Sequence, residues 1–265
     1  MTKDFYKFEK PLIEGIILDR QASFVMICLV NNKKERCHCP TMGRIGEFDN
    51  IGRPCLLSPA KTNNRSTKYT VEAISLNKPE DKNKKWIGIN QTEVNRYIEF
   101  FLKENLMSKM VDTTEQKVLR EQKLGQSRLD FLVGSTYLEV KTPLHFIDLP
   151  IPDYVELKKY SPLTSTDRMV KHIIELANSL KTHQRAIELT TFIYDAPPFR
   201  IKPEHRSKDF ERVSKTFQWA VSKGLEMWQA VLEIDKNGVK LKEYYKFRDS
   251  WHIDENGNMC RNVDF

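Results

Sequence analysis

The sequence predicts an α/β protein of the two-domain α+β type, with a small all-β domain in residues 1–85 and an α/β domain in residues 86–265. Three observations lead to this prediction. First, residues 12–76 contain short runs of β-forming residues between turns. Second, residues 78–85 (KPEDKNKK) are charged and show no apolar periodicity. Third, apolar residues recur at helical spacing after residue 85. A chain of 265 residues with 40% hydrophobic residues can bury one large core or two moderate ones.

The first domain is expected to be a small barrel or sandwich. Its strands are expected at FVMICLV (24–30), ERCHC (35–39), PCLLS (54–58) and KYTVEAISL (68–76), with the turn NNKK between the first two. These runs are rich in residues that favour strands, and turn-forming residues separate them.

The second domain is expected to begin with a helix at 92–106, behind Thr92 as a candidate N-cap. The apolar residues there recur at helical spacing: Val94, Tyr97, Ile98, Phe101 and Leu102. A strand near 117–123 and a hairpin at 127–142 follow.

The remaining elements alternate between the two types. We expect a helix with its apolar face between Met169 and Leu180, capped by Ser165 or Thr166, then a strand at 186–194 and a helix at 207–224. Two strands at 225–234 and 239–247 close the domain. The order αβββαβαββ indicates an α/β domain, and the tail at 248–265 carries no clear signal.

Charge favours a polyanionic partner such as nucleic acid. Lys plus Arg number 43 against 36 Asp plus Glu, which gives a net charge of +7 and a pI near 9.0. Ordinary solubility charge explains these values equally well. Much of the basic character lies in the first third: Lys33, Lys34, Arg36, Arg44, Arg53, Lys61, Arg65 and Lys68. Such a cluster suits phosphate contacts, which give affinity without reading sequence.

Composition also predicts the compartment. No apolar run approaches the length of a membrane span, and the start MTKDFYKFEK lacks the apolar core of a signal peptide. We therefore expect a soluble, cytoplasmic protein without a membrane partner. The five cysteines are odd in number and lack metal-site spacing, so they are interpreted as reduced thiols.

The stretch SRLDFLVGSTYLEVKT (127–142) predicts a hairpin with chemistry on one face. Gly134 and Ser135 fit the centre of a two-residue type II′ turn, and that register places Asp130 directly across from Glu139. Their Cβ atoms would then lie about 5 Å apart, where like charges destabilise a sheet unless a cation intervenes. Alternation adds Arg128 and Lys141 to the same face.

Two interpretations of this face are open. Two carboxylates at that separation suit Mg²⁺, or Mn²⁺ in its place, with Lys141 beside them to position a nucleophile or neutralise a phosphorane. The alternative is a solvated polar face on which Arg128 and Lys141 pair with the acids, and for an arbitrary hairpin this is the commoner case.

The motifs together resemble a known family. SRLDFL followed by YLEVKT resembles the catalytic core of PD-(D/E)XK nucleases, and more closely the sugar fermentation stimulation protein (SfsA) family. Four further stretches agree: HCPTMGRI (38–45), KYTVE (68–72), IGINQTEVNR (87–96) and TDRMVKHIIEL (166–176). One departure is that the family usually has HCPNTGR where this chain has HCPTMGR.

The resemblance implies an N-terminal OB-like β-barrel that binds nucleic acid and a restriction-endonuclease-like α/β domain with a mixed sheet. It makes Asp130 and Glu139 metal ligands, Lys141 the catalytic lysine and Glu99 a further candidate ligand. The DNA contacts that it implies are His38, Arg44, Arg65, Lys68, Arg168, Lys171 and His172. On the second helix, Arg168, Lys171, His172 and Glu175 share one face, although a solvated face explains that spacing equally well.

Two functions follow as expectations. The first is a Mg²⁺-dependent nuclease that hydrolyses DNA, and the second is a non-catalytic DNA-binding regulator of sugar metabolism genes. Two carboxylates aimed at a phosphate repel DNA unless a metal intervenes, which favours catalysis. RNA stays open as a substrate because no 2′-hydroxyl contact can be recognised, and a homodimer would suit cutting both strands although no residue argues for one.

Overall fold

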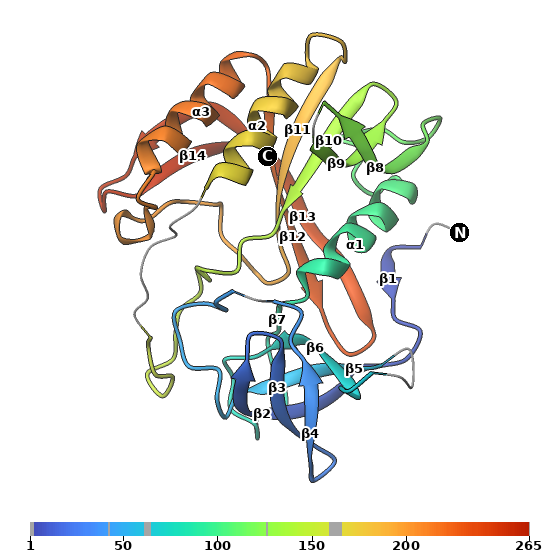
Figure 1. The fold of residues 1–265 in the computed structure, drawn as a ribbon, viewed down its shortest axis with the longest axis vertical. Coiled ribbons are helices and arrows are strands. Elements are labelled where there is room, and N and C mark those ends of the chain that lie inside the picture. Colours follow the sequence, from blue (N-terminus) through green and yellow to red (C-terminus); the bar gives the residue numbers. More distant parts are fainter. Residues whose placement is uncertain (1–2, 42, 61–64, 126, 159–165, 265) are drawn as a thin grey trace.

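Two sheets organise the chain in the computed structural model, which describes residues 3–41, 43–60, 65–125, 127–158 and 166–264. A barrel is built from the first third, and a larger mixed sheet with three α-helices from the rest, one above the other in Figure 1. The predicted two-domain α+β class is confirmed. Within the described residues, no helix is long and apolar enough to cross a membrane.

The first domain is a barrel and not a sandwich. Its strands are β2 (Ile13–Ala22), β3 (Val25–Val30), β4 (Lys33–His38), β5 (Pro54–Pro59) and β6 (Tyr69–Ile74), with the short β7 (Ile87–Gly88) beside β6. Pairing runs in the order β4-β3-β2-β5-β6, and β4 also pairs with β6, so five strands close on themselves. Alternate side chains of β3 (Met26, Cys28 and Val30) fill the interior. All five cysteines are free thiols, as expected.

The larger sheet has the order β1-β13-β12-β11-β10-β9-β8, with β14 beside β13. Its strands are β1 (Phe5–Lys7), β8 (Val118–Leu124), β9 (Ser127–Val133), β10 (Thr136–Lys141), β11 (Arg185–Phe192), β12 (Glu226–Ile234), β13 (Gly238–Ile253) and β14 (Met259–Asp264). β10, β11 and β12 are parallel neighbours and the other pairs are antiparallel, so the sheet is mixed.

Helices cover both faces of this sheet (Figure 1). α1 (Gln91–Lys103) packs on Phe131 and Leu138 on one side, while α2 (Asp167–Ser179) and α3 (Phe210–Ser222) pack on Tyr137 and Met227 on the other. Consecutive residues of a strand point to opposite faces, so Tyr137 and Leu138 of β10 belong to different cores. The same alternation sends Glu139 and Lys141 towards α2.

Several local predictions need correction. Asn90, not Thr92, is the N-cap of α1, and the Thr92 hydroxyl lies 2.6 Å from Asn90 Oδ1. Thr166 is the N-cap of α2, whereas Ser165 lies outside the described residues. Residues 5–7, expected in the first domain, form β1 and pair with β13 in the second sheet. The tail contributes β14, whose polar sequence MCRNVD gives no strand periodicity and which is held by pairing with β13.

The two domains touch through backbone as well as side chains. The N–H of Gly88 in β7 donates to the carbonyl of Ile193, just after β11, at 2.8 Å. Phe48 of the barrel and Leu157 of the long segment after β10 form an isolated antiparallel bridge. The barrel is therefore fixed against the end of the sheet at which β10 and β11 finish.

Candidate active site

The hairpin of β9 and β10 has the predicted register. Gly134 has φ of +55°, and the cross-strand pairs are Val133 with Thr136, Leu132 with Tyr137 and Phe131 with Leu138. The ladder then stops, one pair before Asp130 and Glu139. Asp130 also has no partner in the β8–β9 ladder, which pairs Arg120 with Phe131 and Gln122 with Leu129. Glu121, between these two β8 residues, has φ of +51°. The strands therefore separate at Asp130, which frees its carboxylate for other contacts.

The Asp130 carboxylate is held by two hydrogen bonds. The backbone N–H of Val140 donates to Oδ2 at 2.8 Å, and the side-chain N–H of Asn95 on α1 donates to Oδ1 at 2.7 Å. Burial, together with the nearby Glu139 carboxylate, nevertheless raises the pKa of Asp130, and the two hydrogen bonds oppose that shift. A positive charge at this point would relieve both unfavourable effects.

Glu139 is the more deeply buried acid, with 3% of the residue exposed. Its Oε1 accepts from the ammonium of Lys141 and lies 2.6 Å from Nδ1 of His172 on α2. Its Oε2 is buried and has no hydrogen-bond partner among the described residues. The alternative of a solvated face is therefore wrong for Glu139, although the pairing of Lys141 with Glu139 that it expected is present. Arg128 pairs with Glu121 at 3.1 Å instead of with the acids.

Glu188 of β11 is a further buried acid next to Glu139, which sequence reasoning did not single out. It aligns with Glu139 across the parallel β10–β11 pair, and Thr190 aligns with Lys141. Burial raises the pKa of Glu188 to about 7, against the attraction of Lys141 and Arg261. The one signal for it in the sequence is a charged residue in the middle of the otherwise uncharged strand AIELTTFIY.

The predicted residues of α2 divide between two environments. His172 turns inward to Glu139, whereas Arg168 and Lys171 are exposed and form no ion pair with any described residue. Glu175, one turn beyond His172, has a buried Oε2 without a described partner. Two exposed cations thus lie on the same helix that contacts Glu139, where they can approach a phosphate.

Glu99 lies away from this cluster. Its carboxylate pairs with Lys103 at 2.7 Å and with Arg120 at 3.3 Å, and no described contact joins it to Asp130 or Glu139. Asn95, one helical turn earlier, is the α1 residue that reaches Asp130.

The predicted contacts on the barrel have different surroundings. Lys68 pairs with Glu35 at 2.9 Å, and Arg65 donates to the Thr70 hydroxyl at 3.4 Å. His38 ends β4 next to Arg65. Arg44 lies near His145 of the second domain. Burial is the larger cause that lowers the pKa of His145, and the positive charge of Arg44 is the second.

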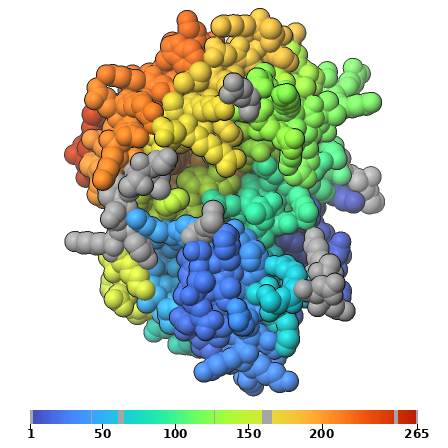
Figure 2. Space-filling model, in the orientation of Figure 1, coloured from blue at the N-terminus to red at the C-terminus, as the bar shows by residue number. Residues whose placement is uncertain are grey.

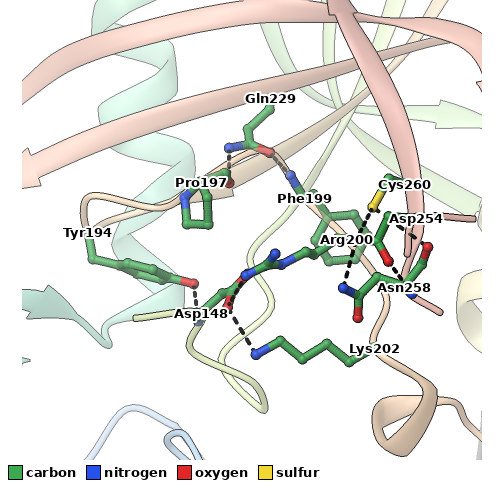
Figure 3. A network of polar contacts seen from close by, with 10 residues as sticks. All are labelled: Asp148, Tyr194, Pro197, Phe199, Arg200, Lys202, Gln229, Asp254, Asn258 and Cys260. Atoms are coloured by element: carbon green, nitrogen blue, oxygen red, sulfur yellow. Dashed lines mark hydrogen bonds and ion pairs between the residues drawn. The ribbon is translucent and has the colours of Figure 1, made fainter. Parts of the chain in front are cut away.

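The segment after β10 is anchored by a polar network (Figure 3). Arg200 forks onto the Asp148 carboxylate at 2.6 and 3.0 Å, and Lys202 approaches it at 3.1 Å. Burial would raise the pKa of Asp148, but these cations outweigh it and lower the pKa. Gln229, fully buried in β12, bonds to Phe199 N–H and Pro197 C=O and so holds the loop that carries Arg200.

The site opens at the surface. Figure 2 shows a hollow bounded by α2 in yellow, the green region of β9 and β10, and the blue barrel below. Access from solvent is consistent with Lys141, which keeps 32% of its side chain exposed while its partner Glu139 is buried.

The residues fit a hard divalent cation. They supply carboxylate oxygens from Asp130 and Glu139, one of which is buried without a described partner. No three His, Cys, Asp or Glu side chains among the described residues converge on one metal position. Mg²⁺ suits such a partial donor set, because it keeps several waters and binds proteins through one or two carboxylates plus substrate phosphate.

Comparison with protein families identifies the chain. Residues 92–238 match the sugar fermentation stimulation protein RE domain, and residues 18–89 match the SfsA N-terminal OB domain. The chain belongs to the SfsA family. Asp130, Glu139 and Lys141 lie in the RE domain of this SfsA protein, and His38, Arg44, Arg65 and Lys68 lie in its OB domain.

Relatives in the SfsA family span almost the whole chain. The sugar fermentation stimulation protein homologs of Bdellovibrio bacteriovorus and Brucella melitensis are 26% and 27% identical, over 89% and 93% of this chain and 97% and 99% of theirs. The homolog of Sulfolobus acidocaldarius is 25% identical over 88% of this chain and 89% of its own.

A solved SfsA structure has the same fold. The structure of Pyrococcus furiosus SfsA in complex with Ca²⁺ superposes with a TM-score of 0.65, at 18% identity, over 91% of this chain and 97% of that one. The closed five-stranded barrel followed by a mixed-sheet domain, expected from the resemblance, is therefore confirmed as the SfsA architecture.

Proposed function

We propose that this SfsA protein is a metal-dependent nuclease that hydrolyses phosphodiester bonds in DNA. The observation that carries the proposal is the buried Glu139, whose Oε2 has no described partner, beside an Asp130 whose pKa is raised by burial and by Glu139. A protein that only binds DNA gains nothing from two desolvated acids at a surface hollow. Asp130 and Glu139 would hold the cation, and the solved relative from Pyrococcus furiosus is a Ca²⁺ complex.

Each side chain has a role in hydrolysis under this proposal. A bound Mg²⁺ or Mn²⁺ supplies a Lewis acid that lowers the pKa of a water molecule and offsets charge on the phosphate. Lys141 directs its ammonium at the negative charge that develops as water attacks phosphorus and the P–O bond to the leaving oxygen breaks. His172 fixes the orientation of Glu139, and Asn95 with the Val140 N–H fixes Asp130.

The positive groups around the hollow supply affinity for the strand. Arg168 and Lys171 on α2 are exposed and without a described ion partner, Arg44 of the barrel lies near His145, and Arg65 is a further exposed cation of the barrel. Contacts of this kind bind phosphate without selecting a base sequence.

One observation favours a non-catalytic DNA-binding protein as the second candidate. Lys141 closes on Glu139 Oε1, so that acid already has a compensating charge. Under this alternative the acids, Lys141 and His172 form a structural cluster, and the barrel and α2 bind DNA without cutting it.

The test is cleavage of labelled single- and double-stranded DNA, and of RNA of the same sequence, with Mg²⁺, with Mn²⁺ and with EDTA. Wild type is compared with Asp130→Asn, Glu139→Gln and Lys141→Met, and binding is measured on the same samples. Glu211→Gln is the matched control, because Glu211 is an exposed helix acid paired only with Lys215 among the described residues.

Metal-dependent cutting that falls about 100-fold or more in the three site variants, with binding kept, supports the nuclease. No cutting with either metal, together with salt-sensitive binding that the site substitutions leave unchanged, would establish the binding protein instead. Cutting of RNA alone would reassign the substrate.

A further inference from the structure

Phe24 is an exposed aromatic side chain at the end of the barrel. It lies in the turn between β2 and β3 and is 44% exposed. Its ring lies almost parallel to that of His38 at the end of β4, with 15° between the planes and 6.2 Å between the centroids. A pair of flat rings at the surface presents a π-face that no other described ring covers.

The turn that carries Phe24 is held rigidly. The N–H of Cys39 donates to the Phe24 carbonyl at 2.9 Å, so the turn and the end of β4 are joined. Arg20 Nη2 contacts the carbonyls of Ser23, Thr41 and Gly43 at 3.1, 2.7 and 3.1 Å. One guanidinium therefore joins the Phe24 turn to Thr41 and Gly43, so hydrogen bonds tie the backbone around the ring pair.

Charge around the ring pair suits a nucleic-acid strand. Arg65 is exposed and lies close enough to His38 to lower its pKa further, after burial as the larger cause. The lowered pKa favours the neutral ring of His38, and Arg65 offers the cation for an adjacent phosphate. Stacking rings next to a cationic groove are the usual means by which OB domains bind single strands.

The ring pair lies at the end of the barrel that faces the second domain. The β3–β4 hairpin points away from the second domain in Figure 1, so the opposite ends of β3 and β4, which carry Phe24 and His38, face it. The loop after β4 continues to Gly43, where an added Cβ would lie 3.4 Å from His145 Nε2. His145 follows Lys141 by four residues, so the loop joins the rings to the segment that leaves the catalytic strand.

We propose that Phe24 and His38 form a platform on which an unpaired base of single-stranded DNA stacks, with the strand continuing past Gly43 and His145 to Asp130 and Glu139. This inference rests on the proposed DNA-directed function and specifies its substrate. A base inside a duplex already stacks on its neighbours, so the platform selects single-stranded DNA or the unpaired end of a duplex.

The experiment compares binding of a labelled oligothymidylate of about 12 nucleotides with an abasic strand of the same length, in EDTA so that no strand is cut. Wild type is expected to bind the strand with bases about tenfold more tightly. Phe24→Ala removes that difference and leaves the affinity for the abasic strand unchanged, whereas Phe24→Tyr retains it. Ile51→Ala, which removes another exposed apolar side chain of the barrel, changes neither affinity.

A second readout reports stacking directly. Fluorescence of 2-aminopurine in the strand is expected to be quenched by wild type and by Phe24→Tyr, and not by Phe24→Ala. Arg65→Met lowers affinity for both strands and reduces the salt dependence, because it removes a phosphate contact. Circular dichroism of each variant verifies that the barrel is folded.

Equal affinity of wild type for the two strands, or equal weakening of both by Phe24→Ala, would overturn the platform. That result leaves the nuclease proposal intact, because cleavage is measured separately with the Asp130 and Glu139 variants. Conversely, an uncut substrate with a base-dependent affinity that Phe24→Ala abolishes would retain the platform and refute the nuclease. RNA bound with the same base dependence would extend the platform to both nucleic acids.

Discussion

Asn95 of α1 donates a hydrogen bond to Asp130 of β9 at 2.7 Å, and so joins the helix to the acid that both strand ladders skip. The contact lies where β9 and β10 separate. The other oxygen of Asp130, Oδ2, accepts from the Val140 N–H, and the two hydrogen bonds together orient the carboxylate. The acid is therefore placed by the helix as much as by its own strand.

Replacement of Asn95 by alanine should weaken cation binding at Asp130. The hydrogen bond favours the charged carboxylate, so its loss raises the pKa of Asp130 further and moves cation binding to higher pH. We expect about a tenfold rise in the Mg²⁺ dissociation constant, measured by calorimetry at several pH values. Asn178→Ala, at an exposed position of α2, is the control, and an unchanged pH dependence in Asn95→Ala would contradict the role.

His172 and Lys171 are neighbours in α2 with different predicted roles. His172→Ala removes the partner of Glu139 Oε1 and should raise the Mg²⁺ concentration for half-maximal cleavage by about tenfold, with little effect on DNA affinity. Lys171→Ala should do the reverse, lowering DNA affinity and the salt dependence of binding while the Mg²⁺ requirement stays the same. Titrations of metal and of salt on both variants separate the two, and identical effects would refute the division.

Glu226 provides a pH-dependent contribution to stability away from the site. Burial alone would raise its pKa, but the bidentate hydrogen bonds from Arg185 at 2.6 and 2.8 Å, with Trp228 and Lys246 nearby, lower it to about 2. Since the folded-state pKa lies below the ordinary value of 4.5, the stabilisation is full above pH 4.5 and is lost as the pH falls towards 2.

The corresponding variant is Glu226→Gln. It should lower the free energy of unfolding by about 1–2 kcal/mol at pH 7, an amount that allows for the partial exposure of Arg185. Urea unfolding at pH 7, 4 and 2.5 should show the difference from wild type shrinking as the pH falls. A difference that stays constant with pH would show that lost packing, and not charge, is responsible.

Gly88 lies at a close backbone approach between the barrel and the second sheet, where its N–H donates to the Ile193 carbonyl at 2.8 Å. A Cβ there would lie 2.5 Å from Ile193 Cγ2, so Gly88→Ala must displace β7 from the end of β11. We expect about 1–3 kcal/mol of destabilisation by urea unfolding, with recovery of part of it when Ile193→Ala is added. Gly52→Ala is the contrast, since no atom lies within 4 Å of its added Cβ and only its φ of +76° opposes the change.

The sequence was informative wherever the determinant is local. The register of the β9–β10 hairpin follows from Gly134-Ser135 and is confirmed, and the order αβββαβαββ is found from α1 to β13. The break at Asp130 could not be predicted, because it depends on Asn95 from a separate helix. Glu188 was missed for a similar reason. The chain reaches β11 from β10 through a helix, so the residues of the two strands do not predict that Glu188 aligns with Glu139.

The strand β1 also changes how the chain must assemble. β1 pairs with β13, whose residues are synthesised more than 230 positions later, so β1 stays unpaired until then. The barrel strands lie between β1 and β13 in the sequence, and the barrel can close as soon as β6 and β7 have been made. During synthesis the barrel can therefore fold while β1, which precedes it in the chain, and β13, which follows it, are still unpaired. The second sheet gains its outer strand only when nearly the whole chain has been made, so completion of the RE domain is delayed until the OB domain is already formed.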